Sequence, residues 1–136
     1  MSKTRRKSGS AGFTLVELMI VITILLVLMA VAVPRYERSI TVAKEAVLRQ
    51  DLFTMRRAID QYTEDKQRAP QALDDLVSDG YLKALPKDPF TNATDSWQGE
   101  TSEDYSSIDQ QEPPGIVDVH SGAGQTGSDG TAYNTW

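Results

Sequence analysis

Few residues of this sequence could carry out catalysis. The chain has no cysteine and one histidine, His120, which leaves little room for thiol chemistry, a disulfide framework or a histidine-rich metal site. Asp74–Asp75 and Glu103–Asp104 are pairs of carboxylates, but adjacent side chains on a helix or strand point apart. The glycines after Gly122 lack the lysine and the strand–helix context of a phosphate-binding loop. We therefore expect a structural protein rather than an enzyme, with His120 at a surface or in a turn.

The residue with the most unusual chemistry is Glu17, a single carboxylate inside a long apolar run. The run Phe13–Val33 has 21 residues and would span about 31 Å as a helix, which matches the hydrocarbon core of a membrane. It is apolar on every face, unlike a surface helix of a soluble domain. An unpaired carboxylate there costs a few kcal/mol, so Glu17 is a functional candidate that requires a cationic partner.

Charge is distributed unevenly along the chain. The first 12 residues have a net charge of +4, whereas residues 69–136 have a net charge of −10. A nucleic-acid-binding protein would carry its basic residues on the folded part instead. The gradient favours a membrane protein whose basic end stays in the cytoplasm and whose acidic end crosses the membrane.

The apolar run has three interpretations. It could be a secretory signal, with basic residues at Lys3–Lys7, an apolar core at Leu18–Met29 and a cleavage site at Ala30–Ala32. It could also be an uncleaved signal anchor. Neither of these interpretations gives Glu17 a role.

The third interpretation comes from a resemblance. The segment Gly12-Phe-Thr-Leu-Val-Glu17 resembles the processing motif of type IV pilins and pseudopilins. The resemblance implies that a prepilin peptidase removes residues 1–12 by cutting between Gly12 and Phe13, and then methylates the new amino group of Phe13. We expect Glu17 to pair with that amine on a neighbouring subunit. A buried charge without a partner is costly, so helix packing in any register that leaves Glu17 unpaired would be less stable.

Residues 13–34 are predicted to form the transmembrane and filament-core helix, and residues 35–68 an amphipathic continuation. Pro34 predicts a kink or a local loosening with helix on both sides. Pro70 disfavours helix through Ala69, so the helix should end near Lys66–Ala69. The apolar stripe expected to hold a small head consists of Tyr36, Ile40, Ala43, Val47, Leu52, Met55, Ile59 and Tyr62.

Residues 69–136 are predicted to be a small head. A short helix is expected in Pro70–Gly80, and strands at Tyr105–Ile108 and Ile116–Val119, before a glycine-rich end. The fold class predicted is therefore α+β: a long N-terminal helix packed on a small antiparallel sheet with a loop-rich end.

The head sharpens the resemblance. Ala58–Tyr62 followed by Gly80-Tyr-Leu-Lys-Ala-Leu-Pro-Lys-Asp-Pro-Phe90 is similar to the G-type major pseudopilins of type II secretion. Members of that family bind calcium in a C-terminal loop, and calcium requires six to eight oxygen ligands. The expected donors are Asp129, Asp118, Ser121, Thr126, Ser128 and Thr131. The alternative is that Asp129-Gly130 forms only a turn.

The resemblance implies a subunit of a type II secretion pseudopilus that polymerises with itself and helps to export folded proteins. Its implied partners are the prepilin peptidase, minor pseudopilins, an inner-membrane platform protein and, indirectly, a secretion ATPase and a secretin. The implied location is the bacterial inner membrane, with the N-terminus cytoplasmic and the head periplasmic, and then a periplasmic filament. A major pilin of a type IV pilus, acting in adhesion or motility, is the first alternative. A secreted or signal-anchored small binding domain is the second.

Overall fold

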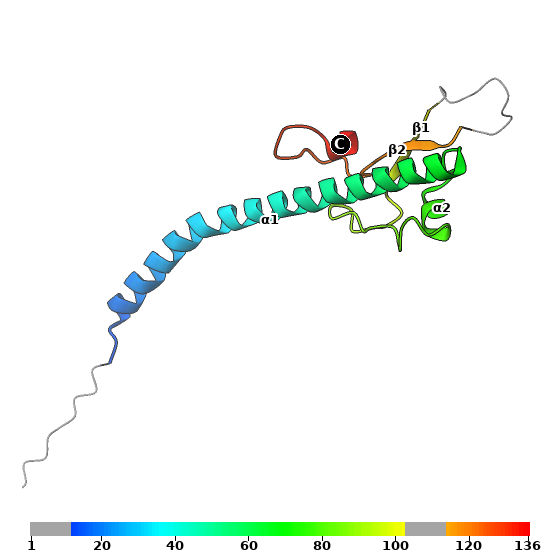
Figure 1. Cartoon of the computed structure of the whole chain (residues 1–136). Coiled ribbons are helices and arrows are strands. Elements are labelled where there is room, and N and C mark those ends of the chain that lie inside the picture. The colour runs from blue at the N-terminus through cyan, green and yellow to red at the C-terminus, as the bar shows by residue number, and fades with distance from the viewer. Residues whose placement is uncertain (1–11, 103–113) are drawn as a thin grey trace, which may run out of the picture. The chain divides into compact units, whose positions relative to one another are not determined.

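The computed structural model describes residues 12–102 and 114–136. Figure 1 shows its elements in chain order, which are α1 (Leu15–Lys66), α2 (Leu73–Ser78), β1 (Gln98–Thr101), β2 (Ile116–His120) and the 3-10 helix η2 (Tyr133–Thr135). The strands form one antiparallel sheet. The predicted α+β class, with a long N-terminal helix and a small antiparallel sheet, is therefore confirmed.

The chain forms two compact units. One extends to Arg38 and the other runs from Ser39 to Trp136, so α1 contributes to both. The second unit contains α2, both strands and η2. It is the predicted head together with the second half of the helix.

The start of α1 is fixed by Thr14. Its hydroxyl oxygen accepts a hydrogen bond from the main-chain N–H of Glu17 at 3.2 Å. A threonine three residues before a glutamate is the pattern of a capping box, which satisfies N–H groups that have no partner within the helix. The carboxylate of Glu17 in the first turn also has a favourable interaction with the helix dipole.

Pro34 lies inside α1, and the helix continues through it. Helix on both sides of Pro34 is as predicted, and α1 is not interrupted there. The end of α1 is local in origin. Gln67 has a left-handed backbone conformation, with a φ of 57°, and Pro70 follows three residues later.

The face of α1 that packs on the head differs from the predicted stripe in its first half. Tyr36, Ile40, Ala43 and Val47 are exposed. The buried positions recur with steps of three and four residues and are Glu45, Leu48, Leu52, Met55, Ala58, Ile59 and Tyr62. The stripe therefore begins at a carboxylate, which an apolar pattern does not detect.

The short helix α2 lies within the predicted Pro70–Gly80 segment. The carboxylate of Asp75 accepts hydrogen bonds from the main-chain N–H groups of Gln71 and Ala72, at 2.9 and 3.0 Å, and so caps the first turn. Leu76 is fully buried and attaches α2 to the core. Gly80, with a φ of 82°, allows the turn that follows.

The sheet pairs β1 with β2 in antiparallel register, with Gln98 opposite His120 and Glu100 opposite Asp118. Strand β2 agrees with the prediction for Ile116–Val119. The sequence did not predict β1, and the predicted strand Tyr105–Ile108 lies outside the described residues. His120 was predicted at a surface or in a turn, but it lies in β2 and is half-buried.

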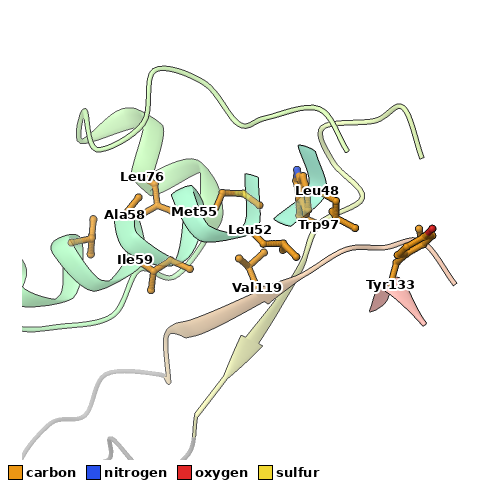
Figure 2. Packing of buried hydrophobic residues seen from close by; sticks show 11 residues of the cluster. Leu48, Leu52, Met55, Ala58, Ile59, Leu76, Trp97, Val119 and Tyr133 are labelled. Carbon is orange, nitrogen blue, oxygen red and sulfur yellow. The ribbon is translucent and has the colours of Figure 1, made fainter. Parts of the chain in front are cut away.

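One core joins these elements. Figure 2 shows Leu52 and Ile59 of α1 near Val119 of β2, with Leu76 of α2 in the same cluster. Val119 is completely buried. Its neighbours in β2, Asp118 and His120, therefore lie on the opposite face of the sheet, because successive side chains of a strand point to opposite faces. Tyr133 of η2 extends the cluster to the end of the chain.

Candidate functional site

The predicted processing site lies just before α1. Gly12 and Phe13 are not helical, and α1 begins two residues after Phe13. Both residues are exposed, Phe13 to 84%. A protease needs an accessible segment that is not locked in a helix, and the Gly12–Phe13 peptide is both exposed and non-helical.

Glu17 is exposed on the first turn of α1, and its main-chain N–H is bound by Thr14. Its neighbours along the helix are apolar and exposed as well. A carboxylate on such a surface becomes costly once the surface is covered by lipid or by other helices, unless it is paired. Its pairing with another subunit stays a prediction.

The apolar half of α1 is exposed on all sides. Every residue from 13 to 33 is exposed, and α1 is the one described helix that is long and apolar enough to cross a membrane. Pro34 lies directly after this stretch. The exposed face is much larger than a soluble monomer usually presents, which is typical of a membrane or assembly segment.

The C-terminal loop is attached to α1 through Glu45. Its carboxylate accepts hydrogen bonds from the main-chain N–H and the hydroxyl of Ser128, at 2.6 and 2.5 Å. The hydroxyl of Tyr133 donates a third bond to it at 2.9 Å. Glu45 is only 1% exposed, so these three donors replace the water that burial removes.

Aromatic stacking supports the same attachment. The rings of Phe90 and Tyr133 stack with centroids 3.9 Å apart, and Trp136 meets Tyr133 edge-on at 5.0 Å. The guanidinium of Arg49 lies 4.1 Å from the centroid of the Trp136 ring. The end of the chain thus packs against the α1 turn that contains Glu45 and Arg49.

These contacts shift two pKa values in opposite directions. The hydrogen bond from the Ser128 hydroxyl contributes most to lowering the pKa of Glu45, and it outweighs burial, which acts in the other direction. Burial and the hydrogen bond to Glu45 raise the pKa of Tyr133 to about 12. Glu45 is therefore ionised and Tyr133 neutral at neutral pH.

Two of the six expected calcium donors have other partners in the folded chain. The carboxylate of Asp118 accepts a hydrogen bond from Nε of Arg56 at 2.6 Å. The hydroxyl of Ser121 is buried and donates to the buried carboxylate of Asp88 at 2.5 Å. In the folded chain Asp118 is thus paired with a cation, and the hydroxyl of Ser121 is engaged with another carboxylate.

Those four donors lie in the loop itself. Thr126 forms a β-bridge with Ala132, and Oδ1 of Asp129 accepts bonds from the N–H and the hydroxyl of Thr131, at 2.9 and 2.6 Å. The hydrogen bonds from Thr131 lower the pKa of Asp129. Oδ2 of Asp129 lies 3.9 Å from Nη2 of Arg49. The loop thus brings Asp129 and Thr131 together, whereas Ser128 faces Glu45.

A second cluster of ligand-type side chains lies on the sheet. Glu100, Asp118 and His120 each place one oxygen or nitrogen within 4.8 Å of the others. Burial lowers the pKa of His120, but the hydrogen bond to Glu100, the main-chain oxygen of Trp136 and the charge of Asp118 outweigh it, so the pKa is raised. Sequence reasoning did not find this cluster.

Comparisons with known proteins agree with the N-terminal features. Residues 7–33 match the family described as "Prokaryotic N-terminal methylation motif". The chain is 37% identical over 103 residues to the type II secretion system core protein G of Pseudomonas aeruginosa, over 64% of this chain and 72% of that protein. The chain belongs to the family of type II secretion system core protein G. The predicted recognition of the G-type family is confirmed.

Other members of the core protein G family match over a greater length. The core protein G of Vibrio cholerae is 32% identical over 148 residues, covering 96% of this chain and 91% of that protein. The competence protein ComGC of Halalkalibacterium halodurans is 36% identical over 73 residues, or 54% of this chain and 72% of that protein. No solved structure gave a significant match.

The roles of two further residues, Glu45 and Asp88, were also missed by the sequence analysis. Glu45 lies three residues before Leu48 and seven before Leu52, on the same face of the helix as both. This position could have indicated that Glu45 is buried. Asp88 accepts the main-chain N–H of Phe90 at 2.8 Å, and an aspartate directly before a proline is a turn signal. In both cases the carboxylate fixes a loop in place.

Proposed function

We propose that this chain is a structural subunit of a type II secretion pseudopilus, which polymerises through its N-terminal helix and helps to export folded proteins. The observation that carries this proposal is the apolar half of α1, which is exposed at every residue and has Glu17 near its start, in a member of the core protein G family. A helix that is apolar on every side is stable only when lipid or other helices cover it. Membrane insertion and polymerisation provide these two environments in succession.

The proposed location is the bacterial inner membrane, with the basic residues before Gly12 in the cytoplasm and the head in the periplasm. The charge gradient supports this orientation, because basic residues are retained on the cytoplasmic side. After extraction from the membrane the subunit would be part of a periplasmic filament. The proposed partners are further copies of the chain, minor pseudopilins, an inner-membrane platform protein and, indirectly, a secretion ATPase and a secretin.

Processing by a prepilin peptidase is proposed between Gly12 and Phe13. The exposed, non-helical peptide there and the match of residues 7–33 to the methylation motif support it. Mass spectrometry of the mature chain should find N-methylated Phe13 as its first residue. A mature chain beginning at Val33 would instead indicate an ordinary secretory signal, and an intact N-terminus would indicate a signal anchor.

Glu17 is proposed to select the packing register of the filament. A carboxylate among packed apolar helices needs a cation, and cleavage creates one on Phe13 of each subunit. We expect Glu17→Ala to be processed and inserted normally but to form few or no filaments. Glu64→Ala, at an exposed position near the other end of α1, is the matched control. Normal filaments from Glu17→Ala would refute this role.

A major pilin of a type IV pilus is the alternative, because the segment Gly12–Glu17 resembles the processing motif of type IV pilins as well as that of pseudopilins. Immunogold microscopy separates the two functions, because a pseudopilus lies in the periplasm and a pilus extends from the cell surface. Deletion of the gene should abolish export of secreted enzymes for a pseudopilin. Loss of surface attachment or motility with normal export would favour the pilin.

Calcium binding stays a proposal, restricted to the loop of residues 126–131. Asp129 and Thr131 are the donors that the fold brings together, and main-chain oxygens would have to complete the site. If calcium binds there, its addition should raise the midpoint of thermal unfolding of the chain in detergent above the midpoint measured with a chelator. Asp129→Asn should abolish the difference. Equal midpoints with calcium and with chelator would remove calcium from the proposal.

A further inference from the structure

We propose that Glu100, Asp118 and His120 form a binding site for a divalent transition metal of the zinc type on the face of the β1–β2 sheet opposite Val119. Nε2 of His120 lies 3.0 Å from Oε2 of Glu100 and 3.8 Å from Oδ2 of Asp118. Tetrahedral zinc with bonds of about 2.0–2.2 Å separates its ligand atoms by roughly 3.4 Å. The two distances from Nε2 are within about 0.4 Å of that separation, and the two carboxylate oxygens lie within 4.8 Å of each other.

The antiparallel register brings these side chains together. Glu100 is directly opposite Asp118, and His120 is two residues further along β2, so all three lie on one face. Val119, between the two β2 ligands, is completely buried on the other face and anchors the strand to α1. The ligands are thus carried by paired, anchored strands rather than by a free loop, which reduces the entropy lost on binding an ion.

The tautomer of His120 is suited to coordination. Its Nδ1 lies 2.6 Å from the main-chain oxygen of Trp136, which can only accept a hydrogen bond. Nδ1 therefore carries the proton, and in the neutral ring Nε2 presents its lone pair to the two carboxylates. A histidine that donates its second ring N–H to a main-chain oxygen is the common arrangement around protein-bound metals.

The donor set selects the class of metal. One imidazole nitrogen and two carboxylates suit zinc and related transition metals, whereas calcium and magnesium prefer six or more oxygens. Arg56 binds Oδ1 of Asp118 and leaves Oδ2 on the side of His120, so each carboxylate would supply one oxygen. The side chain of Glu100 is 63% exposed and that of His120 is 22% exposed, which leaves room for water as the fourth ligand.

The experiment uses the lone histidine as its reporter. The complete chain, with any histidine tag removed, is labelled with ¹⁵N and titrated with zinc in detergent. We expect one equivalent of zinc to shift the Nε2 signal of His120 while Nδ1 stays protonated. Calcium at the same concentration should leave the imidazole signals unchanged. Lack of a response to zinc would overturn the proposal.

Substitutions identify the other two ligands. Glu100→Gln and Asp118→Asn should each weaken zinc binding, measured by calorimetry, by more than about tenfold, and His120→Gln should abolish it. Asp74→Asn, at an exposed position on α2, should leave the affinity unchanged. Zinc affinity that is insensitive to these three substitutions would show binding elsewhere and overturn the site. Circular dichroism detects a variant that unfolds. In that case the imidazole titration of the unmodified chain still decides between metal binding and a simple ion pair of His120 with Glu100.

Discussion

The carboxylate of Glu45 in α1 accepts two hydrogen bonds from Ser128, although 83 residues separate the two in the sequence. The same carboxylate also accepts the hydroxyl of Tyr133. Hydrophobic burial alone is not directional and would allow the glycine-rich loop several positions on the helix. A buried carboxylate with three matched donors specifies one position, because every other position would leave a charge or a donor unsatisfied.

Substitution of Glu45 by alanine should therefore destabilise the head. The variant leaves the buried hydroxyl of Tyr133, and the hydroxyl and main-chain N–H of Ser128, without their acceptor. We expect a loss of about 2–4 kcal/mol in the free energy of unfolding. Urea denaturation of the complete chain in detergent, followed by tryptophan fluorescence, measures the loss directly, because Trp97 and Trp136 both belong to the head.

The control for Glu45 is Glu64→Ala, which removes an exposed carboxylate from the same helix and should change stability by less than about 0.5 kcal/mol. Equal stability of the Glu45 and Glu64 variants would mean that the loop is held by its aromatic contacts and not by the carboxylate.

Tyr133 should make the head sensitive to alkaline pH. Its pKa is raised from 10.0 to about 12 in the folded chain, so the folded state binds the phenolic proton more tightly than the unfolded state does. The stabilisation is fully present below pH 10 and is lost as the pH rises through 12. A shift of this size corresponds to about 2–3 kcal/mol.

Tyr133→Phe should remove this part of the pH dependence, although lysine residues titrate in the same range in every variant. The difference in unfolding free energy between wild type and Tyr133→Phe should therefore shrink between pH 10 and 12. Tyr36→Phe, at a position that is 70% exposed, is the control and should follow the wild type. A constant difference across this range would contradict the proposed coupling of Tyr133 to Glu45.

Sequence periodicity predicted the long helix and its approximate end because these depend on local properties. The run of apolar residues, Pro70 after the last turn and Gly80 after the short helix act within a few residues of themselves. The start of the packed stripe was not predicted, because burial of Glu45 depends on donors that are distant in sequence. Strand β1 was missed for a related reason, since Gln98–Thr101 has no apolar alternation and all four residues are exposed.

The candidate sites also differ in whether they depend on local sequence or on contacts between distant residues. Gly12, Phe13 and Glu17 form a local motif, so their spacing alone was informative, whereas the cluster on the sheet depends on strand register. Asp118 and Ser121 were predicted as calcium donors from the family resemblance, but Arg56 and Asp88 are their partners in the folded chain. Those partners lie 62 and 33 residues away, beyond the reach of any local pattern.

Arg56 should be the most sensitive cation of the head, because it connects α1 to β2 and to the end of the chain. Its Nε donates to Asp118 at 2.6 Å, and its Nη2 donates to the main-chain oxygens of Val119 and Trp136, at 3.0 and 2.7 Å. The Arg56–Asp118 pair is partly exposed, so its electrostatic contribution is reduced by solvent. We expect Arg56→Gln to lower the free energy of unfolding by about 1–2 kcal/mol.

A lysine should not rescue Arg56, because an ammonium group cannot reproduce the fixed fork of a guanidinium that reaches three acceptors at once. Arg57→Gln is the matched control, since the neighbouring arginine is exposed and its loss should have little effect on unfolding.

The unfolding free energies of Arg56→Gln, Asp118→Asn and the double variant form a cycle that isolates the pair. Because Arg56 also holds two main-chain oxygens, Arg56→Gln should still destabilise the chain when Asp118 is already asparagine. If it does not, the side-chain pair alone accounts for Arg56, and the attachment of Trp136 must come from Arg49 and the aromatic rings.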